Sequence, residues 1–216
     1  MRISTSLPFL IFLLCLSSLT IHGQEVVIPS YNDTYSNYIK KLEAGETDIN
    51  YQEFRFSFIE SEQFKIASKK SEEFDKLEKA MYAQMKKHQY NDIIVTTKKM
   101  LTIDYTNMMA HKILRQTYKI LGDTINAAKY KTIQFGLLNS IVKNGDGRTC
   151  ETAWPVIQIE EEYFILNMVD AVFQKQSLDN DTGLCDKMET LVDGKEKIYY
   201  FEVTKVFEGN KKILGK

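Results

Sequence analysis

The residues whose types and spacing could do chemistry lie in short clusters after residue 144. Gly145-Asp146-Gly147 places a carboxylate between glycines, and glycines let a backbone approach an anion or a metal. Glu161-Glu162-Tyr163 brings carboxylates together, and paired carboxylates can serve general acid–base catalysis. Both clusters are therefore candidate binding sites.

Each cluster also has a simpler structural interpretation. Phosphate-binding loops have longer glycine patterns, so Gly145-Asp146-Gly147 fits better as a helix end that runs into a turn, with Gly145 in the left-handed conformation. Neighbouring residues face different ways on a helix or a strand, so Glu161 and Glu162 do not converge on one point. That run fits a solvated turn or the start of a helix.

Histidines and nucleophile motifs do not strengthen a catalytic interpretation. His88 lies in a Lys-Lys-His run typical of a helix end, and His111 takes a packing position on a helix. No His-x-x-x-His pair, cysteine cluster or Gly-x-Ser-x-Gly elbow accompanies them. We expect no catalytic residue, no metal site and no cofactor.

The first 23 residues predict export. Arg2 precedes the uncharged apolar run 7–21, and Gly23 is a small residue at which a signal peptidase could cut. The run is shorter than the roughly 20 apolar residues of a membrane span. Leu14 is too large to precede a lipidated Cys15, so we expect a periplasmic or extracellular protein that is not a lipoprotein, with no transmembrane segment after cleavage.

Cys150 and Cys185 are the cysteines that remain after this segment, and both lie in polar, loop-like surroundings. In an oxidising compartment such a pair can form a disulfide. Two buried free thiols are the alternative, and the sequence leaves both open.

The formal net charge of the 216 residues is −1. Nucleic-acid binding usually needs a strongly basic face, so this balance gives no reason to expect it. The length suits one ordinary domain or two small ones.

Residues 24–143 show helical periodicity, with a polar segment at 60–70 that we expect to link helices. The best-organised part is 71–143, where apolar stripes are separated by short breaks at 88–90, 104–106 and 122–123. Helices joined by such short turns pack as antiparallel neighbours.

Within 71–143, the spacing of four residues resembles that of tetratricopeptide repeats. These residues are Leu114, Tyr118, Gly122 and Ala127. Tyr105 and His111 depart from the repeat, because that family usually has proline and often tryptophan there. The resemblance implies helix pairs that line a concave groove, and an ordinary helical bundle is the alternative.

Residues 144–216 read as a β-rich section. We expect strands at 154–159, 187–192 and 197–203, the last two joined by an Asp193-Gly194 turn. Segment 163–173 suits a helix or a strand, and its neighbours favour a strand. The predicted fold class is α+β: a helical N-terminal section followed by a small antiparallel β-sheet section. We expect the sheet section to pack on the helices as one unit.

The whole chain resembles the exported bacterial domain of unknown function family 4919. The likeness rests on short motifs at 145–147, 152–153, 156–157, 161–163, 176–178, Asp186 with Met188, and 200–201. Cys150 and Cys185 depart from the usual pattern. The family implies no activity, so no functional residue is carried over.

The leading interpretation is a non-enzymatic protein- or peptide-binding module of the bacterial envelope, whose partner is another envelope protein or a peptide. One alternative is a hydrolase or transferase with its site near Asp146 and Glu161. Another is a glycan or small-molecule binder that uses the strand face of Tyr199 and Phe201.

Overall fold

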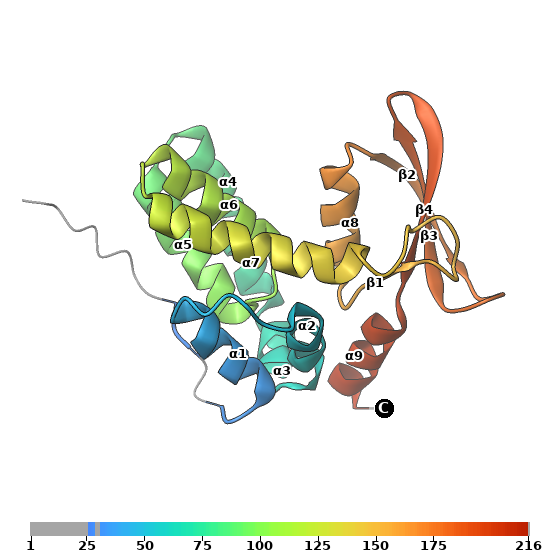
Figure 1. Cartoon of the computed structure of the whole chain (residues 1–216), viewed down its shortest axis with the longest axis horizontal. Helices are drawn as coiled ribbons and strands as arrows, with labels where there is room; N and C mark the ends of the chain where they lie inside the picture. Colours follow the sequence, from blue (N-terminus) through green and yellow to red (C-terminus); the bar gives the residue numbers. More distant parts are fainter. Residues whose placement is uncertain (1–25, 29–30, 216) are drawn as a thin grey trace, which may run out of the picture.

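The computed structural model describes residues 26–28 and 31–215 (Figure 1). The predicted signal peptide, residues 1–23, lies outside the described residues. None of the helices in the described part of the chain is long and apolar enough to span a membrane.

In the residues that the structure describes, seven helices precede the sheet. They are α1 (Thr34–Glu43), α2 (Tyr51–Glu60), α3 (Glu62–Lys69), α4 (Ser71–Lys86), α5 (Tyr90–Ile103), α6 (Met108–Ile120) and α7 (Thr124–Val142). Their starts follow from capping chemistry, because a side-chain oxygen before the first turn accepts an otherwise unpaired backbone N–H. Asp33, Asn50, Asn107 and Asp123 each cap a helix in this way.

The expectation of a polar link over 60–70 is wrong for most of that segment. Ser61 caps α3 by accepting the backbone N–H of Phe64, and the side chain of Phe64 packs into the core. The Gln63 amide is also buried and donates to the carbonyls of Thr102 and Ile103. A polar sequence thus forms a helix because its few buried groups are all satisfied.

Helices α4 to α7 pack consecutively through short turns (Figure 1). Gly122 ends α6 with a φ of 78°, the left-handed conformation that glycine adopts without strain. The resemblance of this section to tetratricopeptide repeats stays a prediction.

The sheet contains β1 (Trp154–Pro155), β2 (Val172–Asp179), β3 (Cys185–Val192) and β4 (Lys195–Glu202), in the order β1-β4-β3-β2. Strands β3 and β4 pair antiparallel, as expected, and the α+β class is confirmed. Strand β2 pairs antiparallel to β3 and covers residues beyond 173, where the sequence pattern predicts no strand. Asp193 and Gly194 have φ values of 51° and 73°, which suit the predicted tight hairpin turn.

The sheet also differs from the expectation, because β1 pairs parallel to β4 and makes the sheet mixed. β1 is only two residues long, whereas the sequence predicts a strand over 154–159. The chain turns after Pro155 because Ile157 donates its N–H to a carboxylate of the following helix rather than to a strand.

Two helices accompany the sheet: α8 (Ile159–Met168) and α9 (Thr204–Leu214). Residues 163–168 are therefore helical, and the strand interpretation holds only from Val172. Phe164, Ile165 and Leu166 are all buried, because α8 lies between the sheet and the helical section (Figure 1). A helix covered on several sides does not show the one-sided periodicity that distinguishes helix from strand.

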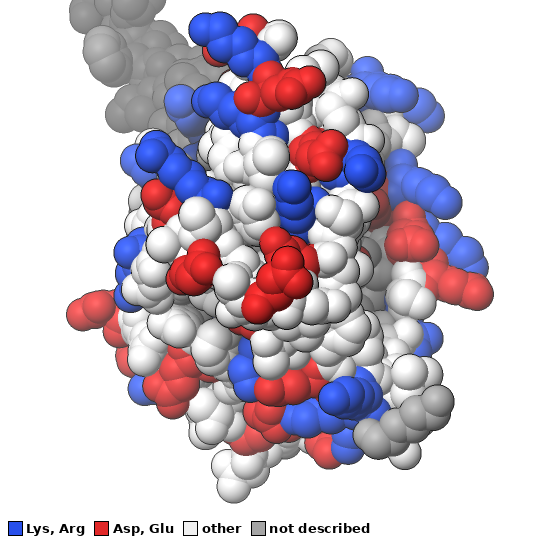
Figure 2. All heavy atoms as spheres, turned by 90° about the vertical axis from the view of Figure 1, so that its right-hand side faces the viewer, with Lys and Arg blue, Asp and Glu red and all other residues white. Residues whose placement is uncertain are grey.

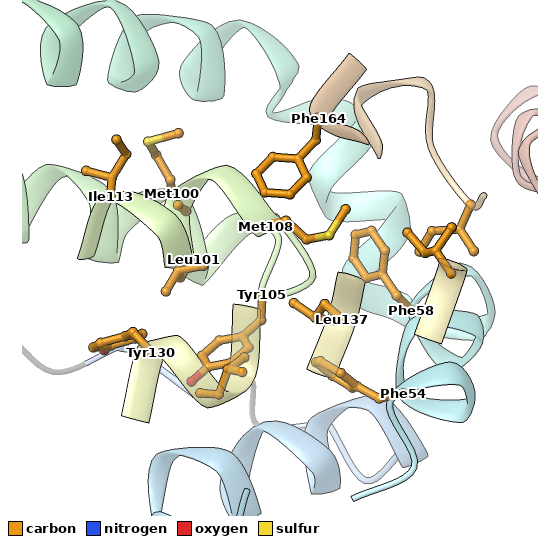
Figure 3. Packing of buried hydrophobic residues seen from close by; sticks show 14 of the residues in the cluster. Phe54, Phe58, Met100, Leu101, Tyr105, Met108, Ile113, Tyr130, Leu137 and Phe164 are labelled. Atoms are coloured by element: carbon orange, nitrogen blue, oxygen red, sulfur yellow. The ribbon is translucent and has the colours of Figure 1, made fainter. Parts of the chain in front are cut away.

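Both sections contribute to one hydrophobic cluster. Figure 3 shows Phe164 of α8 pointing toward Met108 of α6, with Phe54 and Phe58 of α2 and Leu137 of α7 packed nearby. Helix α9 closes over α2 and α3, where Gly209 approaches Phe64 so closely that a Cβ would come 2.8 Å from the ring. The sheet, α8 and α9 are thereby packed on the helices.

Candidate functional site

The Gly145-Asp146-Gly147 loop is held by its own neighbours. Gly147 donates its N–H to the carbonyl of Thr152 (2.9 Å), and Gly145 accepts the indole N–H of Trp154 (3.1 Å). The glycine in the left-handed conformation is Gly147, with a φ of 65°, so the expectation that Gly145 adopts it is wrong. A Cβ on Gly147 would lie 2.8 Å from the Trp154 ring, so the glycine serves close packing.

Asp146 is exposed and stabilises the same loop. Its Oδ1 accepts the Thr152 hydroxyl (2.6 Å) and the Arg148 N–H (3.1 Å). The Thr152 bond and the Arg148 N–H hold the pKa of Asp146 below its usual range. Oδ1 of Asp146 therefore already accepts two hydrogen bonds from within its own turn.

Glu161 is buried in an ion pair with Arg55 of α2. The Arg55 Nε donates to Oε1 (2.8 Å) and its Nη2 to Oε2 (2.5 Å), a bidentate arrangement. Arg55 also donates to the Pro155 carbonyl (3.0 Å) and to Ser140 Oγ (3.3 Å), and Glu161 accepts the Ile157 N–H (2.8 Å). This carboxylate joins α8 to α2, and both of its oxygens accept hydrogen bonds from buried donors.

Glu162 is buried on another side of α8, and neither carboxylate oxygen has a hydrogen-bond partner. Burial, and then the charges of Asp186, Glu161 and Glu160, raise the pKa of Glu162 to about 9. It is therefore protonated at neutral pH. Asp186 on β3 is also buried, and burial raises its pKa.

Tyr163 is exposed, and its ring packs edge-on against Phe173 of β2 at 5.6 Å. The three predicted residues of the acidic cluster thus face three different environments. They form no common acid–base site, and Asp146 does not line the pocket that Glu161 and Tyr163 line.

The aromatic strand residues Tyr199 and Phe201 pack against other side chains of the protein. Phe201 is fully buried, and Tyr199 stacks on Trp154 with ring centres 5.7 Å apart. Trp154 in turn is fixed by its bond to the Gly145 carbonyl. This arrangement leaves little ring face for stacking a sugar.

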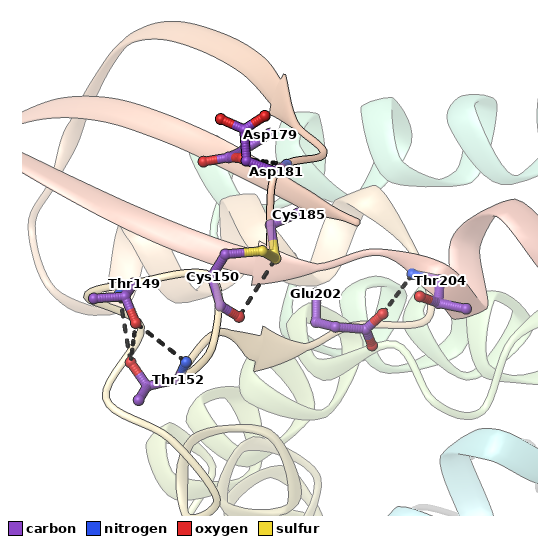
Figure 4. The surroundings of a disulfide bond; sticks show 8 residues. All are labelled: Thr149, Cys150, Thr152, Asp179, Asp181, Cys185, Glu202 and Thr204. Carbon is purple, nitrogen blue, oxygen red and sulfur yellow. Dashed lines mark hydrogen bonds between the residues drawn. A yellow bond between two sulfur atoms is a disulfide. The ribbon is translucent and has the colours of Figure 1, made fainter. Parts of the chain in front are cut away.

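Cys150 and Cys185 form a disulfide that ties the loop after α7 to the start of β3 (Figure 4). A Cβ on Gly183 would lie 3.1 Å from the Cys150 Sγ, so the chain before β3 passes close to the bridge. Of the alternatives that the sequence leaves open, the structure has the disulfide. No group of three His, Cys, Asp or Glu in the described residues could hold a metal ion.

A groove runs along the junction of α4, α6 and α8. It consists of two adjoining pockets of about 500 and 490 Å³. The residues that line both pockets are Phe74, Asp75, Asp104, Asn107, Gln158, Ile159 and Glu160. One pocket continues toward Ile213 of α9, and the other toward Tyr163 of α8. We call this continuous feature the junction groove.

The junction groove combines exposed apolar side chains with carboxylates. Ile159 is 44% exposed, Tyr163 is 43% exposed and Ile213 is 41% exposed. At its floor, burial raises the pKa of Asp104 to about 6, against hydrogen bonds from Thr106 and Gln158. Such a surface suits a partner with apolar groups.

Most residues of the junction groove were not singled out from the sequence. They come from helices far apart in the chain and form no motif. Only Glu161 and Tyr163, which line one of the two pockets, belonged to a predicted cluster. The spacing of Ile159 and Tyr163, which places them one turn apart on a helix, is the one local signal, and it appears only once 159–168 is recognised as helical.

The face that carries the sheet and α9 has Lys, Arg, Asp and Glu interspersed (Figure 2). This view shows no broad basic area of the kind that binds nucleic acid.

These features define a class of α+β protein in which helices and a small mixed sheet share one core and meet at a groove. A family model described as Domain of unknown function (DUF4919) matches residues 25–212, and the chain belongs to that family. The comparisons with curated proteins and with solved structures gave no match.

Proposed function

We propose that this protein is a non-enzymatic binding module for another protein or a peptide, and that the junction groove receives the partner. The observation that carries the proposal is the exposure of Ile159, Tyr163 and Ile213 along one continuous groove. Apolar side chains gathered in a groove favour docking of a segment that covers them.

The state of the carboxylates supports binding over catalysis. Glu161 is neutralised by Arg55, and Asp146 is bonded within its own turn. Chemistry by either group would require breaking contacts that hold the fold together. A partner segment in the groove needs no such rearrangement.

We further propose that the protein works outside the cytoplasm, in the bacterial envelope. The apolar run at 7–21 supports this, and so does the Cys150–Cys185 bridge, because disulfides persist in oxidising compartments. The partner would then be another envelope protein or a peptide present there.

Site-directed photo-crosslinking tests the proposal. A photoreactive amino acid replaces Ile159 in the protein of residues 24–216, and the protein is exposed to a solubilised envelope extract. Ile198 on β4, 43% exposed and outside the groove, is the matched control position. We expect a saturable adduct from position 159 that excess unlabelled protein competes away, and none from position 198.

The variant Ile159→Ser with Tyr163→Ser provides the second measurement. It should abolish the adduct from a photoreactive residue at position 213, while Ile198→Ser should leave it intact. Equal adducts from positions 159 and 198, or adducts that do not saturate, would rule out the groove as the docking surface.

A further inference from the structure

Resting on the proposed function, we propose that the segment bound by the junction groove presents lysine or arginine side chains beside apolar ones. The groove would recognise a basic amphipathic peptide rather than an apolar one. The carboxylates of the groove, and the lack of a lysine or arginine among the described residues that line it, support this preference.

Asp75, Glu78 and Glu160 supply the acidic side of the groove. Asp75 and Glu78 are three residues apart on α4, so they lie on one face of that helix. Glu160 lies in the first turn of α8, across the groove. Burial, followed by the charges of Asp75 and Glu160, raises the pKa of Glu78, so the carboxylates are close enough to repel one another.

No cationic side chain in the described lining of the groove offsets this repulsion. Among the described residues that line its two pockets there is no Lys, Arg or His. None of the ion pairs found in the described part of the chain involves these carboxylates.

Two lysines close to the groove, Lys79 and Lys112, leave these carboxylates without an ion pair. Lys112 donates to Asn167 (3.3 Å) and lies over the Phe164 ring at 5.7 Å, at the edge of the groove. Lys79, next to Glu78 in sequence, lowers the pKa of Glu78, but as the last of the causes that act on it. An incoming cation would therefore relieve repulsion that the fold leaves in place.

The apolar lining specifies the rest of the partner. Phe74 lines both pockets next to Asp75 of α4, and Ile159 and Tyr163 flank Glu160 on α8. Aromatic rings beside carboxylates suit the alkyl stem and charged head of lysine or arginine. A metal ion would use only the oxygens, and no cluster of three ligand residues in the described chain suits one.

Three labelled peptides of identical apolar pattern test the inference. They carry Lys, Gln or Glu at the polar positions, and their binding to the protein of residues 24–216 is measured by fluorescence anisotropy at 20 and 200 mM salt. We expect the Lys peptide to bind about tenfold more tightly than the Gln peptide at low salt, with the difference shrinking at high salt. The Glu peptide should bind weakest.

Asp75→Asn, Glu78→Gln and Glu160→Gln together should remove the preference for the Lys peptide. Glu46→Gln, Asp48→Asn and Glu196→Gln remove the same charge at exposed positions outside the groove and should leave the preference intact. Loss of the preference in both triple variants would show a bulk charge effect and overturn the inference.

The failure of this inference differs from the failure of the proposed function. Equal binding of the three peptides, abolished by Ile159→Ser with Tyr163→Ser, would overturn the cationic preference and leave the groove as a docking surface. Binding of the Lys peptide that survives those substitutions would overturn both.

Discussion

The guanidinium of Arg55 and the carboxylate of Glu161, 106 residues apart in the chain, form a bidentate pair with both side chains buried. The pair links α2 to α8 beneath the junction groove. Its remaining bonds go to Ser140 Oγ, the Pro155 carbonyl and the Ile157 N–H, so nearly every polar atom is satisfied.

Removing one partner of this pair should destabilise the protein strongly. Arg55→Ala leaves the buried carboxylate uncompensated, and we expect it to lower the free energy of unfolding by about 3–5 kcal/mol. Urea denaturation followed by circular dichroism measures the loss. Because the two groups act on each other, Arg55→Ala with Glu161→Ala should cost less than the sum of the single changes. Additive losses would show that the pair is not coupled.

Glu162 should make the protein less stable as the pH rises. Its pKa in the folded protein is about 9, above that of an unfolded glutamate, so the folded state holds a proton that the unfolded state releases. The contribution of Glu162 to stability is fully present below about pH 4.5 and is lost progressively as the pH rises toward 9. The free energy of unfolding of Glu162→Gln, measured relative to wild type, should be higher at pH 8 than at pH 5. The expected increase is at least about 1.4 kcal/mol, the equivalent of one pKa unit.

Denaturant titrations of both proteins at several pH values test the role of Glu162. Glu46→Gln, on an exposed residue, is the matched control and should not change the slope of stability against pH. A parallel slope for wild type and Glu162→Gln would contradict a buried neutral carboxyl group at this position.

His111 should make the protein sensitive to acid. Its Nε2 lies 2.8 Å from the Tyr105 carbonyl, while its buried Nδ1 has no partner. Burial lowers the pKa of His111 to about 4, so the unfolded chain takes up a proton between about pH 6.5 and 4 that the folded protein refuses. This part of the stability is present above pH 6.5 and is lost as the pH falls.

A titration by nuclear magnetic resonance follows the His111 ring directly. We expect its Cε1 proton to keep the shift of a neutral imidazole down to about pH 5. Midpoint protonation near 6.5 in the folded protein would contradict the prediction, as would an unchanged acid slope of stability in His111→Gln.

The disulfide should stabilise the protein because it closes a loop and thereby lowers the entropy of the unfolded chain. Cys150 and Cys185 are 35 residues apart, a separation for which the chain-entropy account gives about 3–4 kcal/mol. Cys150→Ser with Cys185→Ser should lower the free energy of unfolding by that amount, which urea denaturation detects as a lower midpoint. Reductant should shift the wild-type midpoint likewise and leave the double variant unchanged.

Local patterns predicted the elements that depend on local chemistry. The hairpin at Asp193-Gly194 follows from residues within a few positions, and the structure has it. The short breaks expected near 88–90, 104–106 and 122–123 likewise separate α4, α5, α6 and α7. The whole-chain likeness also identified the family correctly.

Elements decided by tertiary contacts were missed. Helix α8 buries most of its residues and carries Ile159 and Tyr163 on its exposed face, so its sequence lacks a distinct polar face and resembles a strand. Helix α3 is polar, and only the burial of Phe64 and Gln63 against distant residues shows why it forms. The junction groove joins helices far apart in the chain, which no motif could reveal.

The bidentate pair also constrains the order in which a growing polypeptide can fold. Until residues 155–161 have been synthesised, Arg55 lacks the carboxylate and the carbonyl that hold it in the interior. Enclosing it earlier would leave a charged group without compensation in an apolar surrounding. A nascent chain released only as far as α7 should therefore keep α2 loosely attached, as a target for proteases and chaperones, and become compact only when α8 arrives.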